Sequence, residues 1–189
     1  MSYLIATNEL TLTDIKAFRA GAVEAVVSRA LALGIAQNRS ELVVRSALPF
    51  TDFGAGATGW SLEFYQGPAI TTTGWGSVYN TGVVATFAPT LANTKVAVFY
   101  KFADYSPVPA ITGIRFRVGG TGATTKATFI SQLETGAKLE PDVYLSEPIV
   151  YDPQDIIYIE AYYSAAVAAG AEQFAFGAFV CERLGANIS

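Results

Sequence analysis

The sequence lacks the residues on which many enzyme mechanisms depend. It contains no histidine, which excludes Ser-His-Asp and Cys-His catalysis and any histidine-ligated metal. It contains one cysteine, Cys181, so neither a disulfide within the chain nor a cysteine-based zinc site can form. We find no catalytic signature and no cofactor site, and we therefore expect a protein that is not an enzyme.

Charge and long apolar runs are also scarce. Charged residues make up 15% of the 189 residues, against roughly 25% in an average domain. The 12 Lys and Arg against 16 Asp and Glu give a net charge of −4, which argues against a nucleic-acid partner. The apolar stretch 165–171 is far shorter than the roughly 18 residues that a membrane helix needs. Residues 1–9 have no basic region, so we expect no signal peptide and synthesis in the cytoplasm.

What is present begins with one long helical pattern, predicted over residues 11–34. Thr11 or Thr13 can cap its start, and Asp14 suits the positive end of the helix dipole. Gly34 is a suitable stop, because glycine readily adopts the left-handed conformation that ends helices. Apolar residues recur at spacings of three and four, as on one face of a helix: Ile15, Phe18, Ala22, Val26, Ala30 and Leu33. This face either packs on its own domain or docks on a neighbouring subunit.

From residue 41 onward the sequence favours strands. The chain has 24 aromatic residues, and all but Tyr3 and Phe18 lie after residue 40. Aromatic side chains favour sheets. We predict strands at 41–48, 60–66, 68–73, 83–88, 94–103, 111–118, 125–132, 143–151, 155–164 and 172–183. Gly or Pro stands in nearly every gap, including Gly74-Trp75-Gly76. This spacing predicts a mainly β, mostly antiparallel fold at 41–189, a β-sandwich or barrel, with an N-terminal segment at 1–40 that contains the helix.

Several predicted strands are apolar on both faces, which bears on assembly. The strands at 94–103, 155–164 and 172–183 need either a cover on both sides of the sheet or a subunit interface. Because so few charges are available for the surface, we favour an interface and predict a homo-oligomer, with a trimer as the first expectation. By contrast, the strand at 111–118 alternates apolar residues with Arg115 and Arg117, so one of its faces is predicted to be wet or ion-paired.

Other motifs have more than one explanation. Glycine-rich stretches at 54–59 and 119–122 lack the ending of a phosphate-binding loop, and we expect ordinary loops. Seven carboxylates against Lys138 between 134 and 160 form either a solvated acidic edge, a calcium site or a glycosidase pair. Trp60, Tyr65, Trp75 and Tyr79 lie near the glycine-rich loops. They serve either as core or interface anchors or as sugar-stacking platforms. We expect Cys181 to be buried and inert.

The second half of the chain resembles a known group of proteins. The segments that carry the resemblance are IRFRVGG at 114–120, TFI at 128–130, EPIVYDPQDIIYIE at 147–160 and FGAFVCER at 176–183. In residue pattern and strand order this half is similar to the jelly-roll cement or decoration proteins of tailed bacteriophages. That resemblance implies a virion protein made in the host cytoplasm, which binds the capsid protein lattice, associates as a trimer and catalyses nothing. It carries over no functional residue.

Two functional hypotheses follow. The first is a non-enzymatic virion structural protein that stabilises a phage shell. The alternative is a carbohydrate-binding β-sandwich, lectin-like or part of a receptor-binding tail. In the first hypothesis the docking face is Ile15, Phe18, Ala22 and Val26. Residues 1–40 hold four basic against three acidic residues, whereas 41–189 hold eight against thirteen, so we expect the helix to meet the acidic region 134–160 of a neighbour or an acidic shell.

Overall fold

Helix α1 and most strands form where local sequence favours them. The computed structural model describes residues 4–47, 52, 65–66, 69, 71–77, 91–106, 110–119, 124–130 and 142–185. The helices are the 3-10 turns η1 (Thr7–Glu9) and η2 (Arg39–Glu41) and the α-helix α1 (Leu12–Ala32). The strands are β1 (Leu4–Ala6), β2 (Leu42–Ser46), β3 (Tyr65–Gln66), β4 (Gly74–Ser77), β5 (Lys95–Asp104), β6 (Ile111–Val118), β7 (Thr124–Ile130), β8 (Asp142–Tyr151), β9 (Ile157–Tyr163) and β10 (Gln173–Arg183).

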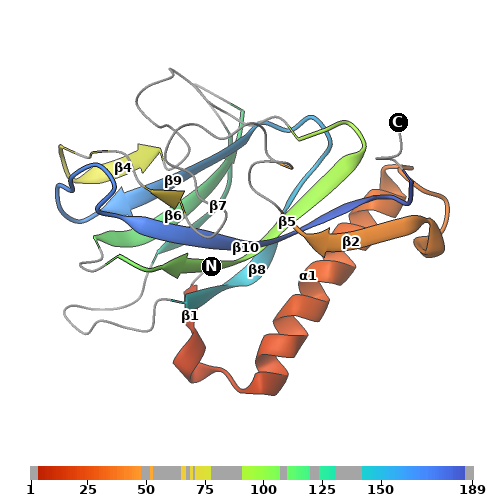
Figure 1. The fold of residues 1–189 in the computed structure, drawn as a ribbon, viewed down its shortest axis with the longest axis horizontal. Helices are drawn as coiled ribbons and strands as arrows, with labels where there is room; N and C mark the ends of the chain where they lie inside the picture. Colours follow the sequence, from red (N-terminus) through yellow and green to blue (C-terminus); the bar gives the residue numbers. More distant parts are fainter. Residues whose placement is uncertain are drawn as a thin grey trace.

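The strand order defines a jelly roll. One sheet has the order β1-β8-β5-β10-β2, with β3 also paired to β10, and the other has the order β4-β9-β6-β7. All of these pairs are antiparallel. The pairs are nested in sequence, so that early strands pair with late ones: β2 with β10, β4 with β9, β5 with β8, and β6 with β7. Alternate partners lie in alternate sheets, which is the arrangement of a rolled-up double sheet. The predicted fold class is therefore confirmed (Figure 1).

The main core lies between the two sheets. Phe99 and Tyr151 of the first sheet and Phe116 and Tyr163 of the second are fully buried there. The ring centroids of Phe99 and Phe116 are 5.6 Å apart, so aromatic contact joins the sheets directly. The Tyr151 hydroxyl donates a hydrogen bond to the carbonyl of Arg117, which satisfies its polar end inside the sandwich.

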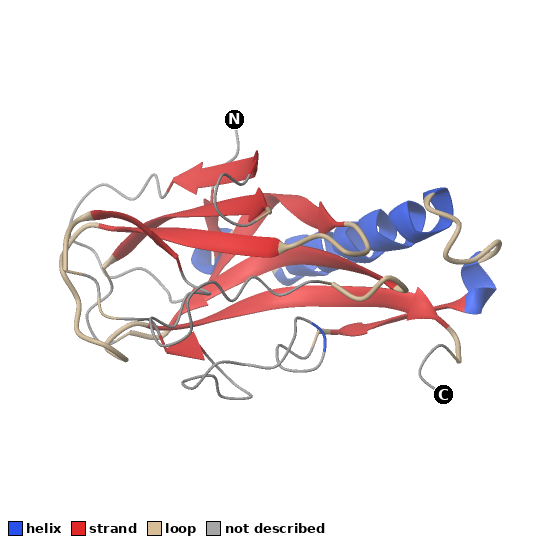
Figure 2. Cartoon of the chain, turned by 90° about the horizontal axis from the view of Figure 1, so that it is seen from above, coloured by secondary structure: helices blue, strands red, loops and turns tan. Residues whose placement is uncertain are grey.

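A second core lies on the outer face of the larger sheet, where α1 covers the strands (Figures 1 and 2). The Thr11 hydroxyl accepts from the Asp14 N–H, and the Asp14 carboxylate accepts from the Thr11 N–H, so a capping box starts the helix. Gly34, with φ +72°, ends it. The buried members of this second core are Ala22, Val26, Val27 and Ala30 of the helix and Val96, Val98, Phe179 and Cys181 of the sheet.

Parts of the strand prediction need correction. Residues 69 and 71–73 are not in a strand, so the strand predicted at 68–73 is wrong. The strand begins at Gly74 instead, because Gly74, Trp75 and Gly76 pair with β9 rather than forming a turn. The short edge strand β1 was not predicted, and its three residues pair with β8. The strand predicted at 83–88 and most of the one at 60–66 lie outside the described residues.

Candidate interaction surfaces

The three strands that are apolar on both faces, β5, β9 and β10, are covered in different ways, and this difference locates a candidate surface. The outer faces of β5 and β10 are covered by α1 of the same chain, so their apolar bulk does not require a partner. Strand β9 differs. Its inward residues fill the main core, but its outward residues Tyr158 and Tyr162 lie on the sheet face opposite to that core. Tyr162 is 39% exposed. The outer face of the smaller sheet is therefore a candidate interaction surface.

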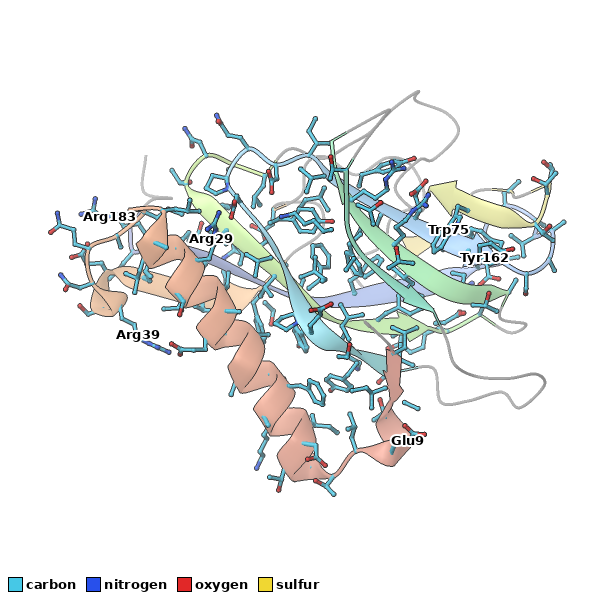
Figure 3. The ribbon with its side chains drawn as sticks, turned by 180° about the vertical axis from the view of Figure 1, so that it is seen from behind. Glu9, Arg29, Arg39, Trp75, Tyr162 and Arg183 are labelled. Atoms are coloured by element: carbon cyan, nitrogen blue, oxygen red, sulfur yellow. The ribbon has the colours of Figure 1, made fainter. Side chains whose placement is uncertain are left out.

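Trp75 and Tyr162 form an aromatic pair on this face. Trp75 of β4 stands opposite Tyr162 of β9 in the register, and their ring centroids are 5.4 Å apart in an edge-to-face arrangement. Figure 3 shows the two side chains next to each other, well away from α1. The guanidinium of Arg115 lies 4.5 Å from the centroid of the Trp75 ring. One face of the indole is thus occupied within the chain by a cation–π contact.

Glu160 organises the arginines of this face. Its carboxylate accepts from the Arg115 Nε at 2.7 Å and lies 3.2 Å from a terminal nitrogen of Arg117. The Glu160 side chain is only 9% exposed, so the aromatic neighbours and the guanidinium groups keep it largely from water. Arg117 also lies over the ring of Tyr158, at 5.7 Å. The alternation in the strand at 111–118 therefore produces an ion-paired outer face, one of the two outcomes that the sequence predicted.

This aromatic–arginine face, defined by Trp75, Arg115, Arg117, Tyr158, Glu160 and Tyr162, is suited to contact rather than to chemistry. Fixed aromatic and arginine side chains are the groups most enriched at protein interfaces, because they bury much area for little lost entropy. The Glu160 carboxylate is paired with two guanidinium groups of the same chain. The face can therefore anchor a partner through the exposed ring of Tyr162.

Most carboxylates of the acidic region 134–160 that the structure describes are paired with cations of the same chain. Lys101 Nζ lies 2.7 Å from Asp142, Lys126 Nζ lies 3.6 Å from Asp155, and Glu160 is held as described above. Residues 134, 138 and 140 lie outside the described part of the chain. Among the described residues, no group of three or more potential ligands could hold a metal ion.

Helix α1 meets this acidic region within its own chain. The Arg29 Nε donates to Asp152 Oδ1 at 2.7 Å, and this hydrogen bond holds the pKa of Asp152 below its usual value. The helix therefore pairs with this region within one molecule, and its predicted contact with the acidic region of a neighbour or with an acidic shell stays a prediction.

The predicted docking face Ile15, Phe18, Ala22 and Val26 is used mainly inside the molecule. Ala22 and Val26 are fully buried against the larger sheet. Phe18 is half-buried, with its ring centroid 5.5 Å from that of Tyr144, and Ile15 is also half-buried. Docking of this face on another subunit stays a prediction, and it would require the helix to leave the sheet that it covers here.

The other residues that the sequence singled out are structural or lie outside the described part. Trp60, Tyr79 and the glycine-rich stretch 54–59 are outside it, whereas Tyr65 lies in β3 and pairs with Phe174. Cys181 is fully buried under α1, and burial raises the pKa of its thiol to about 11. A thiol with so high a pKa carries little thiolate at neutral pH and is a poor nucleophile, as expected.

Two buried charged sites were not predicted. At one end of the larger sheet, Asp52 accepts hydrogen bonds from Arg45 at 2.7 Å and from Lys95 at 2.9 Å. Glu182 accepts from the Arg45 Nε at 3.0 Å, which completes a group of two cations and two anions in which only Arg45 is partly exposed. The second site is Glu172, which is 1% exposed and lies just before β10. Neither site was predicted because most of the partners lie far apart in sequence: Lys95 and Glu182 join Asp52 and Arg45 from other strands, and the donors to Glu172 are more than 60 residues away.

Comparisons with known proteins identify no family. No family of known proteins matches this sequence, and no curated protein is similar to it. Among solved structures, the VP2 subviral particle of infectious bursal disease virus aligns with a TM-score of 0.34 and 13% identity, covering 77% of this chain and 34% of that chain. The Gx strain structure of the same virus aligns with a TM-score of 0.34 and 15% identity, covering 77% and 33%.

This chain spans about a third of the length of those matches. Similarity at this level says nothing about function. Within the described residues, no helix is long and apolar enough to cross a membrane.

Proposed function

We propose that the protein is a non-enzymatic structural component of a virion, a cement or decoration protein that binds and stabilises a phage shell. The observation that carries the proposal is the jelly-roll strand order, because this fold recurs in viral capsid and lectin domains. The low charge of the chain and the resemblance of 114–185 to phage cement proteins support the same function. The protein would be made in the host cytoplasm and would act in the virion.

Self-association is part of this proposal, with a trimer as the first expectation. The outward aromatic residues of β9 support self-association. Helix α1 covers the apolar outer faces of β5 and β10, but it does not cover β9, where Tyr162 is exposed. A stable interface buries roughly 800 Å² on each partner, with a core of aromatic and arginine anchors. The aromatic–arginine face offers such anchors, and we propose that it contacts either a second copy or the capsid lattice.

The experiment measures binding of the purified chain to particles from its native source by co-sedimentation. Tyr162→Ala removes the exposed ring of the aromatic–arginine face without disturbing the main core, and we expect it to weaken binding by at least about tenfold, as loss of an interface anchor does. Tyr105→Ala is the matched control, because Tyr105 is 48% exposed but lies outside this face. Equal binding by both variants and the unchanged chain would exclude the aromatic–arginine face as the contact.

A role for the helix as a docking arm is tested by deleting residues 1–38. A truncated chain that folds but no longer assembles or binds would support the arm. A truncated chain that fails to fold would assign the helix to its own domain. The burial of Val96, Val98 and Phe179 beneath α1 favours the second result, because the deletion would expose all three side chains.

The second candidate function is carbohydrate binding. The observation that favours it is the exposed ring of Tyr162 beside Trp75, since sugar rings stack on exposed aromatic side chains. However, Arg115 already covers one face of Trp75, which leaves less aromatic surface for a sugar. A glycan array separates the two candidates: saturable binding that is lost in Tyr162→Ala would support a lectin, and binding to particles alone would support the structural function.

A further inference from the structure

The connection between β9 and β10 carries an unusual buried carboxylate. Glu172 is 1% exposed and directly precedes β10. The other buried carboxylates, Asp52, Glu160 and Glu182, each pair with lysine or arginine. Within the described part of the chain, Glu172 has no such cation, and its hydrogen-bond donors are neutral groups. Burial of an ionised carboxylate without a cation is costly, so this arrangement calls for a physical explanation.

Glu172 ties two connections of the sandwich together. The Ser106 hydroxyl donates to its Oε2 at 2.5 Å, and the Ala110 N–H donates to its Oε1 at 2.8 Å. These donors flank the connection between β5 and β6, so one carboxyl group holds both of its ends. The Gln173 N–H donates to the Ser106 hydroxyl at 2.8 Å, and the Ser164 N–H donates to the Ala110 carbonyl at 2.8 Å. The contacts lie where β9 ends and β10 begins (Figure 1).

We propose that Glu172 is a proton-sensitive clasp: its buried contacts with Ser106 and Ala110 form a more stable closed arrangement when the carboxyl group is protonated than when it is ionised, because only the ionised form buries a charge. The geometry suits both states. A protonated carboxyl group still accepts from the Ala110 N–H through one oxygen, and its O–H can donate to the Ser106 hydroxyl, which reverses that hydrogen bond without moving either group. The protonated form keeps both contacts and avoids burying a charge.

Burial and one neighbouring charge both favour the protonated form of Glu172. Burial is the largest effect and raises the pKa of Glu172, and the hydrogen bonds from Ser106 and Ala110, which favour the ionised form, offset only part of the total increase. Asp104, at the end of β5, is the charged neighbour that acts on Glu172, and its negative charge raises the pKa further. The Ser106 N–H donates to Asp104 Oδ1 at 3.0 Å, so Asp104 belongs to the same set of contacts.

The direction of the pH effect follows from this raised pKa. Because the folded protein holds this proton more tightly than the unfolded chain does, the stabilisation is fully present below the ordinary glutamate pKa of about 4.5. It is lost as the pH rises through the raised pKa of the folded state. The clasp is therefore expected to be closed in acid and looser at neutral and alkaline pH.

The test is amide hydrogen exchange in peptides covering 104–112 and 164–174, at about pH 5 and about pH 8, corrected for the intrinsic pH dependence of exchange. Glu172→Gln mimics the protonated carboxyl group, because its amide can accept from Ala110 and donate to Ser106. Glu9→Gln removes the same charge at an exposed position that takes no part in the contacts of the clasp. We expect protection in the unchanged chain and in Glu9→Gln to fall severalfold between the two pH values, and protection in Glu172→Gln to stay level.

Equal pH dependence in Glu172→Gln and in the control would overturn the proposal. If Glu172→Gln fails to fold, Ser106→Ala decides instead. It removes the donor that favours the ionised form and so raises the pKa of Glu172 further, and the loss of protection should begin at a higher pH than in the unchanged chain. An unchanged or lower onset in Ser106→Ala would equally contradict the clasp.

Discussion

The burial of α1 against its own sheet makes Val26 a sensitive position. Val26 is fully buried between the helix and the outer face of the larger sheet, among side chains that include Val98 and Phe179. Val26→Ala removes two methyl groups from this site and leaves the backbone able to remain helical. If the helix belongs to the domain, the substitution lowers the free energy of unfolding of the whole chain.

The expected magnitude comes from three terms. Each lost methyl group removes about 0.8 kcal/mol of burial, or about 1.6 kcal/mol for the pair. The unfilled space adds a further cost, because a packed site relaxes only in part. Alanine is the better helix former and returns roughly 0.6 kcal/mol. We therefore expect the free energy of unfolding to fall by about 2 kcal/mol.

Urea denaturation followed by circular dichroism measures this change. Leu12→Ala is the matched control, because Leu12 lies on the same helix but is 66% exposed, and we expect it to change stability by less than about 0.5 kcal/mol. Equal, small effects of Val26→Ala and Leu12→Ala would refute the reasoning. Such a result would mean that α1 does not stabilise the sandwich of its own chain.

Further predictions concern glycines and an ion pair. Gly21→Ala should raise the free energy of unfolding by about 1 kcal/mol, because a Cβ there meets nothing within 4 Å and alanine favours the helix; a lower melting temperature would contradict this. Gly177→Ala should destabilise by about 1–3 kcal/mol in urea denaturation, since its Cβ would lie 2.7 Å from that of Lys101; unchanged stability would show that β10 shifts freely. Arg29 lowers the pKa of Asp152, so this pair stabilises the protein above the ordinary aspartate pKa of about 3.8, and its contribution is lost as the pH falls through the lowered pKa. Asp152→Asn should therefore flatten the acid side of a stability–pH profile, and an unchanged profile would show that the pair contributes nothing.

Local signals in the sequence were sufficient for the helix and for most strands. Thr11, Asp14 and Gly34 act as the start and stop that their chemistry suggests, and the helix lies within one or two residues of its predicted bounds. The strand at 111–118 was also predicted correctly, because alternation of arginine with apolar residues is a local signal of period two.

Partners distant in sequence explain what could not be predicted. Strand β4 contains two glycines that favour turns, and it forms only because β9 offers an edge to pair with. The apolar bulk of β5 and β10 favoured a subunit interface in the sequence, yet α1 covers it. Glu172 gave no signal, since its donors Ser106 and Ala110 are more than 60 residues away.

The most direct test of the central claim is electron cryomicroscopy of particles that co-purify with the protein from its native source. We expect a two-sheet jelly roll of this size at symmetric positions on a shell, with copies in contact through the aromatic–arginine face or the helix face. A protein found only in the soluble fraction, with a native mass of 20.0 kDa for a single chain and no density on any particle, would contradict it.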